Sequence, residues 1–234
     1  MGKNKLKKFA QNELFAHVIQ PSSSEVLNTD FRLKGKWNEE FGNANPIVLE
    51  LACGKGEYSV GMAEIYPEKN FIGIDKKGAR IFSGAKEVEE KRLSNVRFLR
   101  TKIDFITSFF AQNEISEIWI LFADPQLEKP RKRLTSSIFL NRYIQILQPD
   151  GLLNLKSDST DLYNFTRDES IPEFNAINGA VSFEKKADTN ALYEEGIEEF
   201  DETMQAVLNI RTFYEQMWLE QGKKIMFLSY GMRK

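Results

Sequence analysis

Cysteine and histidine are almost absent from this chain of 234 residues, which contains one of each, Cys53 and His17. A single cysteine excludes an internal disulfide and a zinc site built from cysteines, as is typical of proteins in a reducing compartment. A single histidine excludes a histidine-rich metal site, so the sequence predicts no bound metal. We expect His17, close to the N-terminus, to lie on the surface.

Long apolar runs are also missing. Stretches such as "IWILFA" (118–123) are far shorter than a membrane span. The basic start, "MGKNKLKKFAQNELFA", lacks the apolar segment of a secretory signal. The sequence therefore predicts a cytoplasmic protein without a membrane partner.

Net charge is small, at −2, but the charges are distributed unevenly. Residues 1–8 contain four lysines and no acid, and residues 129–133 contain four basic residues and no acid. The segment 193–202 carries six acids in ten positions, which masks both basic patches in the total. Such runs are often only solvated faces, yet a basic patch is also what a nucleic acid requires.

Short apolar runs alternate with helical patterns along the chain, which indicates an α/β fold with a largely parallel sheet. We expect a Rossmann-like domain with a seven-stranded, mostly parallel sheet and helices on both faces. Residues 1–40 would form a basic N-terminal arm, and residues 41–234 a single domain. The expected strands cover residues 46–53, 70–75, 95–100, 117–124, 151–158, 181–186 and 223–231.

Three segments have helical character. Apolar residues recur at helical spacing within 76–92, and a second pattern covers 134–147. A third helix is predicted over 208–222, where Gly222 would end it.

A glycine loop, "ELACGKGEYS", follows the first expected strand. Gly54 and Gly56 permit a tight turn and close approach of a ligand to the backbone. Ala52 and Ser59 occupy positions where a dinucleotide fingerprint requires glycine, so nicotinamide chemistry is disfavoured.

Three acids follow the same pattern of strands. Glu50 lies inside the first strand, where a buried carboxylate is costly unless it has a partner such as a cationic ligand. Asp75 ends the second strand, at the usual position of an acid that binds ribose hydroxyls, and Asp104 follows the third strand, where it could reach an adenine amine. Taken alone, Glu50 could accept bonds from backbone amides and Asp75 could begin a helix. Three acids at successive strand ends favour a cofactor site.

This arrangement resembles the class I S-adenosylmethionine-dependent methyltransferases, whose first motif reads E-x-G-x-G-x-G. The matching segment is "ELACGKG", and the resemblance covers about residues 46–158. It implies S-adenosyl-L-methionine as cofactor, bound by Glu50, Gly54, Gly56, Asp75 and Asp104.

Over nearly the whole chain, three further motifs resemble the bacterial tRNA (guanine-N7-)-methyltransferases of the TrmB type. They are "DPQLEKPRKRL" (124–134), which lacks the Trp and His of the family's D-P-W-P-K-K-R-H, then "LKSD" (155–158) and "TFYE" (212–215). The resemblance implies methylation of guanine N7 at position 46, in the variable loop of tRNA. It implies substrate contacts by Lys129, Asp158, Thr212 and Glu215.

Guanine N7 carries a lone pair at neutral pH, so its methylation requires alignment more than a strong base. The product is cationic, and a nearby carboxylate would stabilise the transition state. We expect Asp124 to be the catalytic residue and to contribute to cofactor binding as well. Arg131, Lys132 and Arg133 would bind RNA phosphates.

Two alternatives remain open from the residues alone. The first is an enzyme of the same fold that methylates a small molecule or a protein amine. The second is a non-catalytic RNA-binding protein with a decayed cofactor site. The sequence does not distinguish a monomer from a homodimer.

Overall fold

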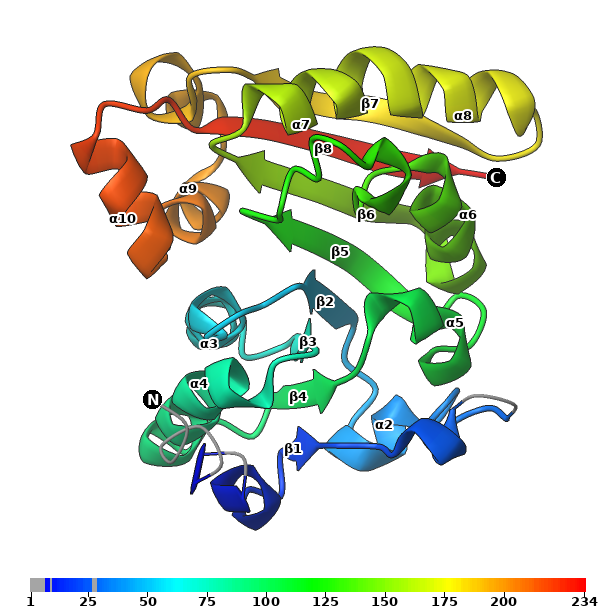
Figure 1. The fold of residues 1–234 in the computed structure, drawn as a ribbon, viewed down its shortest axis with the longest axis vertical. Helices are drawn as coiled ribbons and strands as arrows, with labels where there is room; N and C mark the ends of the chain where they lie inside the picture. The colour runs from blue at the N-terminus through cyan, green and yellow to red at the C-terminus, as the bar shows by residue number, and fades with distance from the viewer. Residues whose placement is uncertain (1–6, 9, 27–28) are drawn as a thin grey trace. The chain divides into compact units, whose positions relative to one another are not determined.

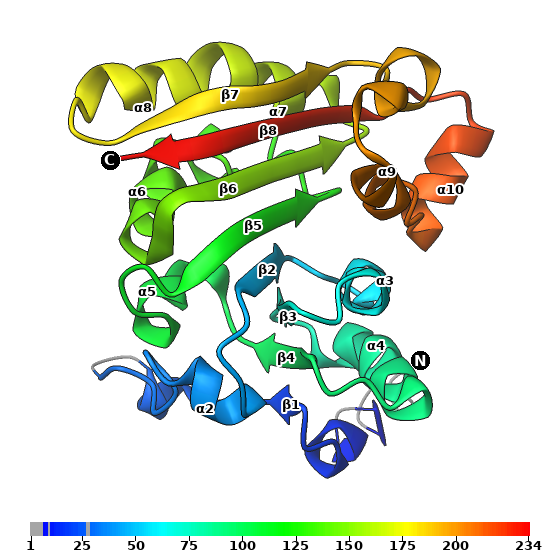
Figure 2. The same cartoon turned by 180° about the vertical axis from the view of Figure 1, so that it is seen from behind.

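The computed structural model describes residues 7–8, 10–26 and 29–234, and the chain divides into two compact units, residues 1–111 and 112–234 (Figures 1 and 2). Lys3 and Lys5 of the basic N-terminal segment lie outside the described residues. Each unit has its own strands and helices and is described separately.

The described residues of the first unit form four strands, all parallel, in the order β1-β4-β3-β2. Every residue of β2 and β3 is buried, as expected of parallel strands that helices cover. The strands are β1 (Val18–Ile19), β2 (Ile47–Leu51), β3 (Asn70–Asp75) and β4 (Val96–Arg100), and the helices are α2 (Trp37–Phe41), α3 (Glu57–Ile65), α4 (Gly78–Lys91) and α5 (Ile106–Phe109).

The second unit also has four strands, in the order β5-β6-β8-β7. β5 and β6 are parallel, whereas β8 runs antiparallel to both of its neighbours. Helices α6, α7 and α8 lie along one face of these strands, while α9 and α10 lie at the end where β5 and β6 finish (Figures 1 and 2). The strands are β5 (Ile115–Leu121), β6 (Leu147–Ser157), β7 (Ser182–Thr189) and β8 (Met226–Arg233), and the helices are α6 (Ser137–Ile146), α7 (Thr160–Asn164), α8 (Ile171–Ile177), α9 (Glu202–Leu208) and α10 (Phe213–Glu220).

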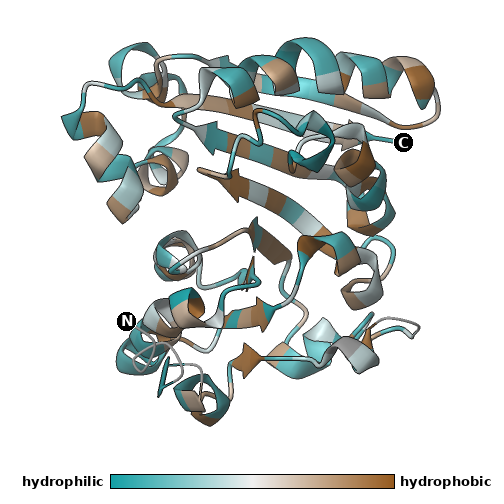
Figure 3. Cartoon of the chain, viewed as in Figure 1, coloured by the Kyte–Doolittle hydropathy of each residue, from teal (hydrophilic) through white to brown (hydrophobic). Residues whose placement is uncertain are grey.

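Hydropathy differs between the strands that carry the candidate sites. In Figure 3 β2 is largely hydrophobic, whereas β6 has hydrophilic segments. The sequence of β2, IVLEL, contains one acid, Glu50, and the sequence of β6 contains Asn154 and Lys156, which are both fully buried. A buried charge such as that of Lys156 requires partners.

The α/β class and the mostly parallel strand pairing are confirmed. The described residues form eight strands instead of seven, because a two-residue strand, β1, pairs with β4. A two-residue strand has no recognisable alternation in sequence, so only the tertiary structure reveals it. The assignment of residues 1–40 to an arm and 41–234 to one domain stays a prediction.

Two local predictions were wrong. The helix expected over 208–222 is interrupted: α9 ends at Leu208, and α10 begins at Phe213 because Thr212 caps it. His17 is buried, not on the surface, and its Nε2 lies 2.9 Å from the carbonyl oxygen of Ala85. Burial lowers the pKa of His17.

Candidate functional site

Glu50 is an acid inside a fully buried strand. Its side chain is 3 % exposed, and its Oε2 accepts hydrogen bonds from the backbone N (2.8 Å) and Oγ (2.5 Å) of Ser59. Ser59 lies in the first turns of α3, so the contact joins strand to helix across the glycine loop. Burial raises the pKa of Glu50 to about 8, which the two bonds from Ser59 oppose only in part. A ligand that carries positive charge would restore the carboxylate.

Asp75 holds the glycine loop in place. Its Oδ2 accepts from the backbone N of Gly54 at 3.1 Å, and its Oδ1 accepts from the backbone N of Lys77 at 2.7 Å. Ala52 and Gly54 both have positive φ, 59° and 58°. A Cβ on Gly54 would meet no atom nearer than the Ala52 carbonyl oxygen, 3.9 Å away. The loop backbone at Gly54 is therefore open to a ligand.

Gly56 has a different role from Gly54. A Cβ at Gly56 would lie 2.4 Å from the ring of Phe98, and one at Gly84 would lie 2.4 Å from the Lys55 carbonyl oxygen and 2.7 Å from the same ring. Gly73 is crowded by Phe98 as well, at 2.8 Å. The three glycines make room for one aromatic ring behind the loop, so packing explains Gly56 without a ligand.

Asp104 lies in an exposed helical turn, η3 (Ile103–Phe105), four positions beyond the end of β4. In the parallel register Asp75 pairs with Arg100, the last residue of β4, so Asp75 and Asp104 lie toward the same end of adjacent strands. Asp75 contacts Gly54 directly, and Glu50 contacts Ser59 on the helix that follows the loop. These residues fit S-adenosylmethionine: buried Glu50 suits its cationic amine, exposed Asp104 is accessible to its adenine, and the backbone is open at Gly54.

Asp124 lies in the second unit, on an exposed loop three residues beyond the end of β5. Its Oδ1 accepts from the backbone N of Gln126 at 3.0 Å, which closes a tight turn. Phe122 and Gln126, on either side of Asp124, have φ of 48° and 46°, a conformation that is costly for residues other than glycine. The backbone of the loop is therefore strained on both sides of Asp124.

The basic cluster behind Asp124 separates into two kinds of residue. Lys129, Arg131 and Lys132 are exposed. Arg133 is only 7 % exposed; its Nε donates to the Pro125 carbonyl oxygen at 2.8 Å, and its guanidinium lies 4.4 Å from the centre of the Phe165 ring. Arg133 therefore stabilises the Asp124 loop through its contact with Pro125.

Asp158 follows the end of β6 and makes an ion pair with Lys223, 3.1 Å from Nζ to Oδ2. Both residues line a hollow of about 630 Å³, together with Tyr163, Arg167 and Lys224. The hollow is open, and charged side chains of both signs line it.

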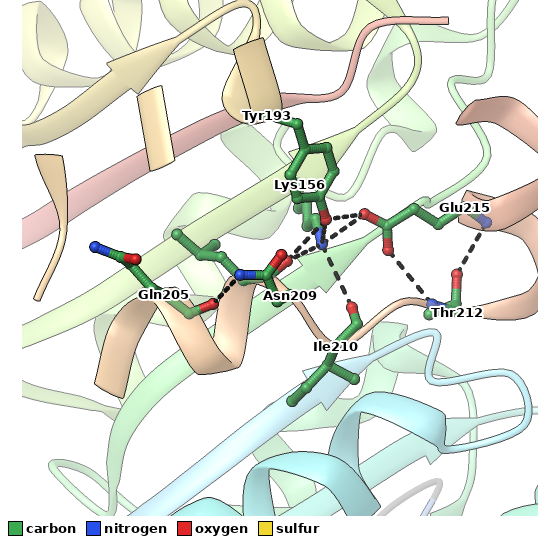
Figure 4. Close-up of polar contacts among 8 residues, drawn as sticks. Lys156, Tyr193, Gln205, Asn209, Ile210, Thr212 and Glu215 are labelled. Atoms are coloured by element: carbon green, nitrogen blue, oxygen red, sulfur yellow. Dashed lines mark hydrogen bonds and ion pairs between the residues drawn. The ribbon is translucent and has the colours of Figure 1, made fainter. Parts of the chain in front are cut away.

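Thr212 and Glu215 lie together at the start of α10 (Figure 4). Thr212 Oγ1 accepts from the backbone N of Glu215 at 3.2 Å, and Glu215 Oε2 accepts from the backbone N of Thr212 at 3.4 Å, a capping box. Glu215 is fully buried, and its Oε1 lies 2.7 Å from the ammonium of Lys156. Both carboxylate oxygens of Glu215 therefore have partners within the protein.

Lys156, Tyr193 and Ser59 contact predicted site residues and were not predicted from the sequence. Tyr193 donates to Glu215 Oε1, and Lys156 donates to Tyr193 at 2.9 Å. Burial lowers the pKa of Lys156 to about 8, against the opposing effect of Glu215. The signal was present, because Lys156 interrupts a buried strand just as Glu50 does.

Among residues 7–8, 10–26 and 29–234, no group of three or more His, Cys, Asp or Glu side chains is arranged to hold a metal ion. Within the same residues, no helix has the length and apolar character needed to span a membrane.

Comparisons with known proteins identify the family. Residues 44–228 match the family described as "Putative methyltransferase". The chain is 44 % identical to a tRNA (guanine-N(7)-)-methyltransferase of Bacteroides thetaiotaomicron, covering 99 % of this chain and 87 % of that protein. It is also 44 % identical to the protein of the same name from Christiangramia forsetii, covering 99 % of both chains.

The fold is similar to that of the 16S rRNA methyltransferase KamB, with a TM-score of 0.61 over 86 % of this chain and 94 % of that one. At 12 % identity this likeness concerns the fold alone. The relatives of similar length decide the family: this chain belongs to the bacterial tRNA (guanine-N(7)-)-methyltransferases of the TrmB type, within the class I S-adenosylmethionine-dependent methyltransferases.

Proposed function

We propose that the chain transfers a methyl group from S-adenosylmethionine to N7 of guanine 46 in the variable loop of tRNA. The observation that carries this proposal is the 44 % identity, over 99 % of the chain, to proteins named tRNA (guanine-N(7)-)-methyltransferase. The predicted cofactor acids of the first unit suit the cationic methyl donor. The exposed basic residues of the second unit suit the anionic tRNA, so both sets of residues support the proposal.

The chain's main task in this reaction is alignment. The cofactor supplies an electrophilic methyl group on its sulfonium, and guanine N7 already carries a lone pair. Glu50, Gly54, Asp75 and Asp104 hold the cofactor, with the Glu50 carboxylate facing its cationic amine. Holding two reactants in line can account for several kcal/mol of the barrier, on the order of 7–11 in favourable systems.

Carboxylates on the second unit select and stabilise the base. Methylation places a positive charge on the purine, and Asp124 stabilises that charge as it develops. Asp158 accepts from the N1–H and the exocyclic amine of guanine, donors that adenine does not present in the same pattern. Thr212 contributes a further substrate contact at the start of α10, and Lys129 contacts the nucleotide from the Asp124 loop. The predicted contact of Glu215 with guanine is not part of this proposal, because Glu215 is buried and both of its carboxylate oxygens have partners within the protein.

The test is a methylation assay with a defined product. The protein is incubated with radiolabelled S-adenosylmethionine and unmodified tRNA, which is then digested to nucleosides. Label should appear in N7-methylguanosine, and a tRNA with adenine at position 46 should remain unlabelled. Label in another nucleoside contradicts the proposed substrate, and transfer to a small molecule or protein but not to tRNA supports the first alternative.

Exposed basic residues of the Asp124 loop should carry the RNA phosphates. Replacing Lys129, Arg131 and Lys132 by Ala should weaken tRNA binding and flatten its salt dependence by about 2 units of log Kd against log salt, at somewhat under one unit per phosphate contact. Arg133 is left intact because it supports the loop. Binding is measured by fluorescence anisotropy across a salt series.

The matched control removes three exposed positive charges from β7 and β8, by replacing Lys185, Lys186 and Arg233 with Ala. This variant should keep the wild-type salt slope. Equal slopes for both triple variants would remove the loop cluster from the RNA contact.

The partner and location follow from the same proposal. The partner is tRNA, the protein works in the cytoplasm as a monomer or homodimer, and neither a metal nor a membrane takes part. The basic residues 1–8 add to the RNA contact. Deleting these residues should weaken tRNA binding without changing cofactor affinity.

A further inference from the structure

Lys156 is at the centre of a buried polar network in the second unit (Figure 4). Its ammonium donates to Tyr193 Oη at 2.9 Å and to the Leu208 carbonyl oxygen at 2.7 Å, and it pairs with Glu215 Oε1 at 2.7 Å. Both charged side chains are 0 % exposed. An ammonium has three hydrogens, and each of these three partners can accept one of them. Nothing in the proposed reaction assigns a role to this lysine.

The network ties together segments that are distant in sequence. Lys156 lies on β6, Tyr193 on the helical turn η6 (Leu192–Gly196), Leu208 at the end of α9, and Glu215 in the first turn of α10. The Ile210 carbonyl oxygen lies 3.5 Å from the same ammonium, within the connection between α9 and α10. Carbonyl groups at a helix C-terminus attract positive charge, so Lys156 stabilises the point at which α9 ends.

All the segments of this unit that carry predicted guanine contacts meet at Lys156. Its backbone oxygen accepts from the backbone N of Phe122, which begins the strained loop bearing Asp124, at 2.9 Å. Asp158 follows two residues later along the chain. The side chain of Lys156 pairs with Glu215, and the capping box of Glu215 with Thr212 sets the start of α10.

We propose that Lys156 is a positioning residue for guanine recognition, which fixes Thr212 and Glu215 relative to the end of β6 through its buried ion pair. This inference rests on the proposed function. Lys156 acts through Glu215 and does not touch the reacting atoms.

Charge, and not only packing, is what the position requires. The titratable or charged groups facing the ammonium are Glu215 from α10, Tyr193 from η6 and Arg211 from the connection, and the ring of Phe122 lies 5.8 Å away. Arg211 is itself directed at the Tyr193 ring, 4.7 Å from its centre. Loss of the Lys156 charge leaves the buried Glu215 carboxylate without its cation and frees it to move.

The experiment compares Lys156→Met, Lys156→Arg, Glu215→Gln and the double variant Lys156→Met/Glu215→Gln. Lys186→Met, which removes an exposed ion pair with Glu184 on β7, is the control. For each variant, unfolding midpoint, S-adenosylmethionine Kd, tRNA Kd, and kcat and KM for tRNA are measured.

Lys156→Met should raise KM for tRNA by roughly tenfold or more and leave the cofactor Kd unchanged, because it removes substrate positioning. Lys156→Arg should retain most activity. Wild-type activity should decline as the pH rises through about 8, where Lys156 loses its proton, whereas the Arg variant should keep its activity because arginine stays charged. The double variant removes both buried charges, so it should regain stability without regaining affinity for tRNA.

Recovery of wild-type KM in the double variant would mean that the network is structural only and would overturn the inference. A wild-type KM in Lys156→Met would overturn it as well. If wild-type protein forms no N7-methylguanosine, the proposed function fails separately, and tRNA Kd then decides the inference. Equal tRNA Kd for wild type and Lys156→Met would reject it.

Discussion

Replacing Asp124 by Ala should lower kcat for tRNA methylation by about 10²–10³-fold while S-adenosylmethionine affinity stays near the wild-type value. The reason is that the carboxylate stabilises positive charge that appears on guanine only as the methyl group is transferred. An interaction made in the transition state alone lowers kcat and kcat/KM together. Single-turnover rates measure the loss of catalysis, and calorimetric titrations measure the affinity for S-adenosylmethionine.

Alanine removes two features at once, the charge and the bond from Gln126 N to Asp124 Oδ1. Asp124→Asn separates them, because an amide oxygen accepts the same bond but carries no charge. If charge is decisive, Asn should be nearly as inactive as Ala. If the loop conformation is decisive, Asn should retain most of the wild-type rate.

A neighbouring acid provides the control. Glu128→Gln removes one negative charge from the same exposed loop, four positions away. Its turnover should stay within about twofold of wild type, since surface charge alone has a small effect. An unchanged rate in Asp124→Ala would exclude Asp124 from the chemistry.

Glu50→Gln should abolish a proton release that accompanies cofactor binding. Burial raises the pKa of Glu50 to about 8, so the ligand-free protein holds this proton at neutral pH. A cationic ligand favours the carboxylate, so binding should expel the proton and the affinity of wild-type protein should rise between about pH 6 and pH 8. Titration calorimetry in buffers of different ionisation enthalpy measures the released proton directly.

Glu50 also makes the stability of the folded protein depend on pH. In the unfolded chain Glu50 ionises near its ordinary value of 4.5, and in the folded protein near 8. Its contribution is fully present below the lower value and is lost as the pH rises through the upper one. Ligand-free wild type should therefore lose stability between about pH 5 and pH 9, by the order of a few kcal/mol.

Glu50→Gln mimics the protonated acid, so its stability should vary less over this range and its cofactor affinity should be roughly tenfold lower or worse at about pH 8. Glu64→Gln removes one partner of an exposed ion pair between Glu64 of α3 and Lys91 of α4, and this variant should behave like wild type. The stability data come from urea midpoints. Wild type and Glu50→Gln profiles of the same shape, with no proton release by either, would exclude Glu50 as the linked group.

Sequence reasoning predicted the fold because its signals are local. Apolar runs bounded by turns located all strands except β1, and each acid of the predicted cofactor site was chosen by its position at a strand. Asp75 ends β3 as expected, and Glu50 has the partner that a buried acid requires, Ser59. Ser59 itself was not predicted, because a serine nine positions away in a helix has no distinctive pattern.

Contacts between distant segments could not be predicted. Arg133 belongs to a basic run in sequence, yet Pro125 and Phe165 bury it beside the Asp124 loop. Glu215 looks like an exposed acceptor at the start of a helix until Lys156, 59 positions earlier, is brought to it. Such roles depend on contacts between residues that are distant in sequence, and local sequence patterns do not predict these contacts.

The left-handed residues Phe122 and Gln126 have a consequence for directed evolution. Glycine at Gln126 would relieve a conformational cost of about 1 kcal/mol, so a screen for heat resistance would enrich it. The same change would increase the mobility of Asp124, and the heat-resistant variants would therefore be poor catalysts. A library built for thermotolerance should therefore leave residues 122–126 unvaried.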